Sequence, residues 1–312
     1  MMKLSSHRTA GIQLLLAIGF ILIFAPLCRG QQKVQFTQYM FNGLVINPAY
    51  AGAEEALSLT FIQRNQWNKV ENAPTTQTFS AHTLVKKKKL GLGLTLVNDK
   101  IGVHKNLSVL TNYAYHIQTG SSSYLSMGIQ AGFHNAKSDY ASLTGATNDP
   151  KIYNMNISST FFDFGAGIYF RSAKFQAGLS APELLPNKVS LSDSVSVQLN
   201  RTNLFLFSKY NITLTENLNF EPSVLLKYIP DLPFSFDVNV NLVYRNVINF
   251  GLSYRKNESV DFLFKAQVTP QLQFGYAYDH TIGDVARLSN ASHELMVHYL
   301  FRYTQTKIVT PR

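Results

Sequence analysis

The stretch 233–244 alternates between apolar and polar side chains over most of its length. One parity carries Phe234, Phe236, Val238, Val240, Leu242 and Tyr244, and the other carries Ser235, Asp237, Asn239 and Asn241. A period of two places these sets on opposite faces of a β-strand and excludes an amphipathic helix. In a soluble sandwich the apolar face would pack in a core, whereas in an outer-membrane barrel it would meet lipid and the polar face would line the interior.

Fourteen segments have the composition of such strands. They are 55–65, 75–85, 90–98, 106–118, 124–134, 159–170, 173–181, 201–212, 217–228, 233–244, 246–256, 259–269, 271–280 and 293–303. Many are close to the ~9 to 11 residues that a tilted strand needs to cross a bilayer, and longer than most strands of soluble proteins. We therefore predict an all-β fold, a transmembrane antiparallel up-and-down β-barrel of about 14 strands. A soluble secreted pair of β-sandwiches is the alternative.

The links between these segments alternate in length. Short turns are expected at 86–89, 119–123, 171–172, 213–216, 245 and 270, and longer links at 66–74, 99–105, 135–158, 182–200, 229–232 and 281–292. Only 257–258 breaks the alternation. Outer-membrane barrels have short periplasmic turns and longer external loops, so an even strand number puts both termini in the periplasm.

Tyrosines should mark the two membrane interfaces. On the up-and-down path, Tyr228, Tyr254, Tyr276 and Tyr278 fall near the outer rim, and Tyr115, Tyr169, Tyr210, Tyr244, Tyr299 and Tyr303 fall near the periplasmic rim.

The first thirty residues have the pattern of a secretory signal peptide. Lys3 and Arg8 give a basic start, residues 11–27 are almost wholly apolar, and Gly30 supplies a small residue for cleavage. We expect the mature chain to begin at Gln31. A membrane anchor is the alternative, although the run is shorter than the ~20 residues of a spanning helix.

Composition limits the chemistry and the partners. Removal of Lys3, Arg8 and Arg29 with the signal peptide lowers the net charge from +10 to +7, and the remaining charge is scattered. We expect no nucleic-acid partner, and outer-membrane lipid or acidic protein surfaces as partners instead. No spacing of residues indicates a catalytic site, a cofactor or a metal site. A lipid-acting enzyme would need a nucleophile beside a rim histidine such as His104 or His280, and spacing assigns none.

The segment 31–54 before the first strand is irregular but rich in aromatic residues, unlike an exposed tail. We predict that it packs into or under the barrel, either as a purely structural plug or as a surface that also meets a partner. Gly91 and Gly93 give one strand a small inner face with room for it. The predicted organisation is a signal peptide at 1–30, a periplasmic lead-in segment at 31–54, a barrel at 55–303 and a periplasmic tail at 304–312.

Short motifs in order along the chain resemble the PorP/SprF family of outer-membrane proteins of the type IX secretion and gliding machinery. They are QFTQYMFN at 35–42, NPAYAG at 47–52, RNQW at 64–67, APTTQT at 73–78, GLG at 91–93, NDKIG at 98–102, YAYD at 276–279 and SHEL at 292–295. Lys33 and Val34 stand where the family pattern often begins with Asp-Pro, and 304–312 extends beyond the last strand.

The resemblance implies a non-enzymatic outer-membrane barrel that supports export or surface attachment of a large secreted protein, such as an adhesin with a type IX C-terminal domain. It also implies periplasmic, peptidoglycan-linked secretion components as partners, with the outer loops 135–158 and 182–200 facing the client. The candidate partner-binding residues are Phe36, Gln38, Tyr39, Asn42, Asn47, Pro48, Tyr50, Arg64, Gln66 and Trp67. The alternative function is a passive outer-membrane porin or small-solute channel.

Overall fold

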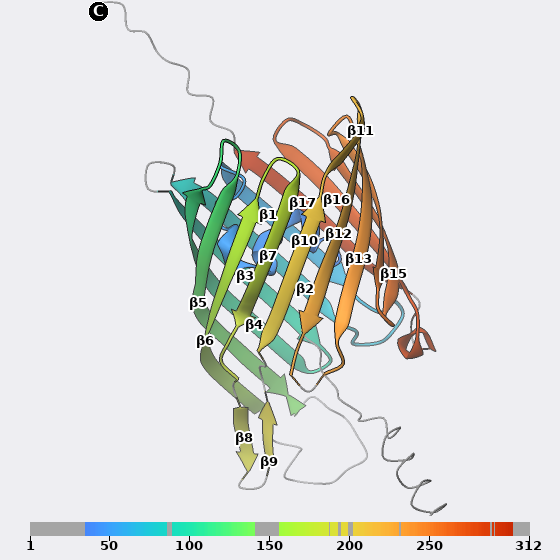
Figure 1. Cartoon of the computed structure of the whole chain (residues 1–312). Helices are drawn as coiled ribbons and strands as arrows, with labels where there is room; N and C mark the ends of the chain where they lie inside the picture. Colours follow the sequence, from blue (N-terminus) through green and yellow to red (C-terminus); the bar gives the residue numbers. More distant parts are fainter. Residues whose placement is uncertain are drawn as a thin grey trace, which may run out of the picture. The chain divides into compact units, whose positions relative to one another are not determined.

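The computed structural model describes residues 35–85, 89–140, 156–186, 188–192, 195–198, 202–230, 232–287, 289 and 291–301. Within them, fifteen strands form one antiparallel sheet, and all of these except β11 build a closed barrel (Figure 1). The barrel strands are β1 (Leu57–Asn65), β2 (Thr75–Val85), β3 (Leu90–Ile101), β4 (His104–Gln118), β5 (Tyr124–Asp139), β6 (Asn156–Arg171), β7 (Phe175–Glu183), β10 (Asn203–Tyr210), β12 (Leu218–Tyr228), β13 (Ser235–Tyr244), β14 (Ile248–Arg255), β15 (Ser259–Gln267), β16 (Leu272–Thr281) and β17 (Ala291–Phe301). The predicted all-β barrel is confirmed.

The first and last strands of the barrel pair with each other. β1 and β17 run antiparallel from Leu57 opposite Phe301 to Asn65 opposite His293. β10 pairs with both β7 and β12, which closes the ring on the other side. Each described strand of the ring therefore pairs with a neighbour on both sides over at least part of its length, as a membrane-spanning sheet requires.

Three short strands lie outside the barrel wall. β8 (Lys188–Ser192) and β9 (Val195–Gln198) form a hairpin between β7 and β10, and β11 (Ile212–Thr215) pairs with β12. A short 3₁₀ helix, η6 (Asp284–Arg287), lies between β16 and β17. No helix among the described residues is long and apolar enough to span a membrane.

One predicted long link is wrong. β3 and β4 extend until Ile101 faces His104, so the link predicted at 99–105 shrinks to a tight turn at Gly102 and Val103. Gly102 has a φ of +56°, which permits a two-residue hairpin turn. The remaining long links stay at one end of the barrel, here called the long-loop end, and the opposite end is called the short-turn end.

The strand faces follow the predicted alternation. Asn239 and Asn241 are buried, while Val240 and Leu242, which follow them one by one along the strand, lie on the outer face. Tyr169 departs from the predicted rim position, because it is buried against Tyr50 on the inner side. Tyr303 lies outside the described residues.

The space inside the barrel holds the chain that precedes β1. It forms three 3₁₀ turns, η1 (Tyr39–Phe41), η2 (Gly43–Val45) and η3 (Pro48–Tyr50), drawn in blue within the ring of strands in Figure 1. We call residues 35–54 the lumenal segment. The loop pattern placed both termini at the short-turn end. In the structure Phe301 ends β17 there, whereas Gln35 contacts Lys227 near the long-loop end of β12.

Candidate functional site in the barrel lumen

The lumenal segment is held at the long-loop end by a buried group that we call the seam anchor: Arg64, Asp279 and Glu294 with Thr37 and Gln38. The Arg64 guanidinium lies 2.7 Å from Asp279 Oδ2 and 3.0 Å from Glu294 Oε2. The backbone N–H groups of Thr37 and Gln38 each donate to the Glu294 carboxylate at 2.9 Å. One carboxylate therefore binds both the wall cation and the main chain of the segment, in the manner of charge-assisted hydrogen bonds.

A second charged group, the rim anchor, consists of Lys227, Asp237 and Arg255. Asp237 Oδ1 lies 2.6 Å from Lys227 Nζ and 3.3 Å from Arg255 Nε. Lys227 donates to the Gln35 side chain, and Arg255 donates to the Phe36 carbonyl at 3.4 Å. The two anchors thus hold four consecutive residues, 35–38, against strands from different parts of the wall.

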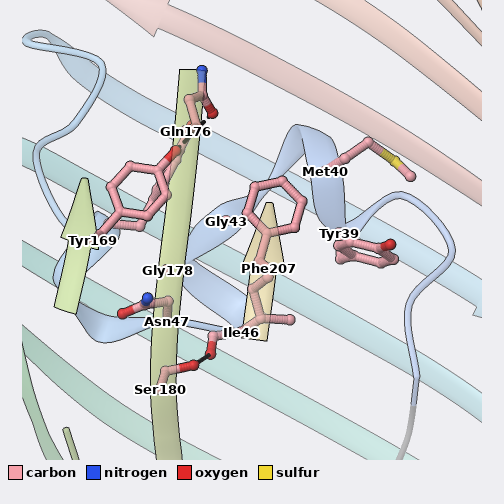
Figure 2. A pocket seen from close by; sticks show the side chains of 11 residues that line it. Tyr39, Met40, Gly43, Ile46, Asn47, Tyr169, Gln176, Gly178, Ser180 and Phe207 are labelled. Atoms are coloured by element: carbon pink, nitrogen blue, oxygen red, sulfur yellow. Dashed lines mark hydrogen bonds between the residues drawn. The ribbon is translucent and has the colours of Figure 1, made fainter. Parts of the chain in front are cut away.

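The middle of the segment packs through its aromatic and amide side chains (Figure 2). The Tyr39 ring meets Phe207 edge to face at 6.2 Å, and its hydroxyl accepts from Asn239. Asn47 accepts from the Ala49 backbone N–H and donates to a wall carbonyl, so it caps η3 and ties it to β6. The residual cavity beside these side chains is about 10 Å³, roughly the room for one water.

At the short-turn end, histidines of the wall bind the main chain of the segment. His116 Nε2 lies 2.8 Å from the Ala51 carbonyl oxygen, and Ser126 Oγ lies 2.8 Å from His116 Nδ1. The Gly52 backbone N–H donates to His82 Nδ1 at 3.2 Å. Because a carbonyl only accepts, His116 carries a proton on Nε2 in this arrangement.

Glycines of the wall make room for the segment. A Cβ at Gly91 would overlap the Ala51 carbonyl, and one at Gly128 would overlap the backbone of Pro48 and Ala49. A Cβ at Gly275 on β16 would overlap the Gln38 side chain. The segment therefore packs closely against the small inner face predicted at Gly91.

The candidate residues divide between two places. Phe36, Gln38, Tyr39, Asn42, Asn47, Pro48 and Tyr50 follow the lumenal segment, and Arg64 joins them through the seam anchor. Gln66 and Trp67 instead line a surface hollow of about 400 Å³ formed by the β1–β2 loop. Partner binding by any of these residues remains a prediction.

The sequence interpretation missed most of the wall residues that hold the segment. Glu294 and Asp279 are not among the candidate partner-binding residues named from the sequence. The available signal was the position of the charged residues along their strands. Arg64, Asp279 and Glu294 all lie close to the long-loop ends of neighbouring strands. Strand pairing was needed to recognise this, because the residues are far apart in sequence.

Two serine–histidine pairs have the nucleophile-beside-histidine arrangement that the enzyme hypothesis would require. Ser138 Oγ lies 2.7 Å from His104 Nδ1, and Ser108 Oγ lies 2.6 Å from His134 Nδ1. The second pair is buried on the inner side. Neither pair was assignable from sequence spacing, since each joins two strands.

One group of described residues has the spacing of metal ligands. Ligand atoms of His134, Asp163 and Glu183 lie within 4.8 Å of one another, and all three side chains are buried. Asp163 Oδ1 accepts from the backbone of Phe164 and Leu184, which fixes the carboxylate. One imidazole and two carboxylates suit a divalent cation such as zinc. The same residues also form a histidine–carboxylate pair, with 3.7 Å between His134 Nε2 and Asp163 Oδ2.

Comparison with solved structures gives outer-membrane barrels. The CymD monoaromatic hydrocarbon channel matches with a TM-score of 0.51 and 12% identity, over 84% of this chain and 92% of that chain. The outer membrane protein Omp33 of Acinetobacter baumannii matches with a TM-score of 0.46 and 7% identity, over 79% and 98% of the two chains. The KdgM porin matches with a TM-score of 0.41 and 8% identity, over 78% and 99%. At these identities the likeness concerns the fold alone.

No curated protein sequence matches the chain. The sequence model of the family described as "Type IX secretion system membrane protein PorP/SprF" matches residues 28–299. The match covers the lumenal segment and nearly all of the barrel. The chain belongs to the PorP/SprF family of type IX secretion system membrane proteins.

Proposed function

We propose that this protein is a non-enzymatic barrel of the type IX secretion or gliding apparatus, which supports the export or surface attachment of a large secreted protein such as an adhesin. The family match over 28–299 carries the proposal. The protein would sit in the outer membrane of a Gram-negative bacterium, with its short turns and C-terminal end in the periplasm. Its partners would be the secreted client, through its C-terminal domain, and peptidoglycan-linked components in the periplasm.

The filled lumen supports this proposal over that of an open pore. Residues 35–54 contact strands around the ring, from Glu294 on β17 to Asn239 on β13 and Ser180 on β7. A barrel whose interior is occupied by its own chain offers surfaces for docking at its two ends rather than a water-filled path.

A passive channel is the second candidate. The fold match to the CymD monoaromatic hydrocarbon channel favours it. Conduction would require the lumenal segment to leave or to rearrange, because its anchors at 35–38 and 51–52 bind opposite ends of the wall.

The test is co-purification of the tagged protein from outer membranes in mild detergent, together with surface and medium proteomics of a deletion strain. A large secreted protein and peptidoglycan-linked lipoproteins should co-purify, and the secreted protein should be lost from the surface of the deletion strain. A barrel that purifies alone, leaves the surface proteome unchanged on deletion and conducts ions in planar bilayers would establish the channel instead.

A further inference from the structure

The lumenal segment has a defined direction through the barrel. Gln35 and Phe36 bind Lys227 and Arg255, which are among the last residues of β12 and β14 before the long-loop end. Ala51 binds His116, close to the short-turn end of β4. The chain therefore traverses the lumen from the long-loop end to the short-turn end and then enters β1.

Chain geometry restricts what precedes Gln35. Four residues separate Gln35 from the cleavage expected after Gly30, and four residues span at most ~14 Å. From Arg64, in the seam anchor, to Leu57 at the short-turn end of β1 is seven residues, or about 23 Å along the strand. The processed N-terminus cannot reach the short-turn end past a segment that is fixed at residues 35–38.

The contacts of residues 35–38 make this direction specific. The N–H groups of Thr37 and Gln38 converge on one carboxylate, and the Phe36 carbonyl accepts from Arg255. The two N–H donors face the Glu294 carboxylate, and the carbonyl acceptor faces the Arg255 guanidinium. A main chain that ran in the opposite direction would not place its donors and acceptor against these charges in the same order.

We propose that the processed N-terminus of this protein is displayed on the external face of the outer membrane, while the C-terminal end of the barrel faces the periplasm. The lumenal segment then crosses the lumen of the barrel, and the start of the mature chain lies beside the external loops. The inference rests on the outer-membrane orientation and on cleavage before Gln31, and it does not depend on a type IX client.

Single cysteines test the sidedness, because the chain's one native cysteine, Cys28, is removed by the cleavage expected after Gly30. Gln35→Cys reports on the start of the segment, Asn68→Cys on the β1–β2 loop and Ser121→Cys on the turn between β4 and β5. Intact cells are treated with a membrane-impermeant maleimide, and lysed cells serve as the reference.

We expect Asn68→Cys and Gln35→Cys to react in intact cells and Ser121→Cys to react only after lysis. Reaction of Gln35→Cys only after lysis, with Asn68→Cys reactive in intact cells, would overturn the proposal. Reaction of Ser121→Cys but not of Asn68→Cys in intact cells would also overturn it, by inverting the barrel. Loss of client co-purification would leave these labelling results unchanged, so the two proposals fail separately.

Two further measurements cover a Gln35→Cys variant that is unreactive or does not fold. A short epitope tag placed directly after Gly30 should bind antibody on intact cells, and binding only after permeabilisation contradicts the proposal. In addition, Asn42 Nδ2 lies 2.9 Å from Ser80 Oγ. A short thiol crosslinker should join the Asn42→Cys, Ser80→Cys pair but not the Asn42→Cys, Ser223→Cys pair on another strand; equal joining would show that the segment is not held in this position.

Discussion

Substitution of Glu294 by Gln should release the lumenal segment. Glu294 is fully buried and accepts from the backbone of Thr37 and Gln38 and from Arg64, at 2.9, 2.9 and 3.0 Å. A glutamine has only one side-chain oxygen to accept hydrogen bonds, and its NH₂ group would face donors that it cannot bind. Loss of one partner of a buried ion pair costs about 3–5 kcal/mol. Arg64 keeps Asp279, so we expect the lower end, about 3 kcal/mol.

The assay is limited proteolysis of the folded, detergent-purified protein, with cleavage within 35–54 as the readout. When opening and closing are fast compared with cleavage, the rate follows the open population. A loss of about 3 kcal/mol then raises the rate by about two orders of magnitude. Glu55→Gln is the matched control, because its pair with Arg171 is partly exposed and should contribute only ~0.2–1 kcal/mol. Equal cleavage of the two variants would show that the seam anchor does not hold the segment.

Three further substitutions test other parts of the structure. Gly128→Ala should destabilise the packing of the lumenal segment by about 1–3 kcal/mol, because the added Cβ overlaps the segment's backbone. Gly120→Ala is the control, since a Cβ there meets only ordinary contacts. Equal midpoints of denaturant unfolding for the two variants would refute the close approach at Gly128. Asn47→Ala should cost about 0.5–2 kcal/mol through loss of the η3 cap, measured by the same proteolysis; an unchanged rate would show that the cap is dispensable. Val240→Arg should destabilise the barrel in liposomes by about 2–4 kcal/mol if this outer face lies in lipid near the midplane; a change below ~0.5 kcal/mol, typical of an exposed soluble surface, would refute that placement.

The barrel was predictable from sequence because the alternation of apolar and polar residues within a strand shows which residues lie on each of its two faces. The alternation in 233–244 appears directly in the structure, where buried Asn239 and Asn241 alternate with outward-facing Val240 and Leu242. The turn at Gly102 was missed because a polar run reads equally as a loop or as strand continuing past the membrane, and hairpin pairing decides between them.

The site was predictable only in part. The aromatic content of the lumenal segment and the glycine at 91 indicated that the segment packs into or under the barrel, and its contacts with the wall place it inside. Tyr169 was placed at the rim because local sequence gives a tyrosine's height but not its contact with Tyr50. The direction of the segment could not be read from sequence, because it depends on which wall charges come together near the long-loop end.

The position of the seam anchor couples the segment to barrel closure. Arg64 on β1 lies directly opposite Glu294 on β17 in the pairing that joins the first and last strands. Thr37 and Gln38 bind this same pair, so the segment bridges β1 and β17, the first and last strands of the barrel. Because the segment lies between wall residues on opposite sides of the lumen, it must be in place when that seam forms or be threaded in afterwards. Glu294→Gln should therefore slow closure of the barrel as well as release the segment, an effect that Glu55→Gln, away from the seam anchor, should not share.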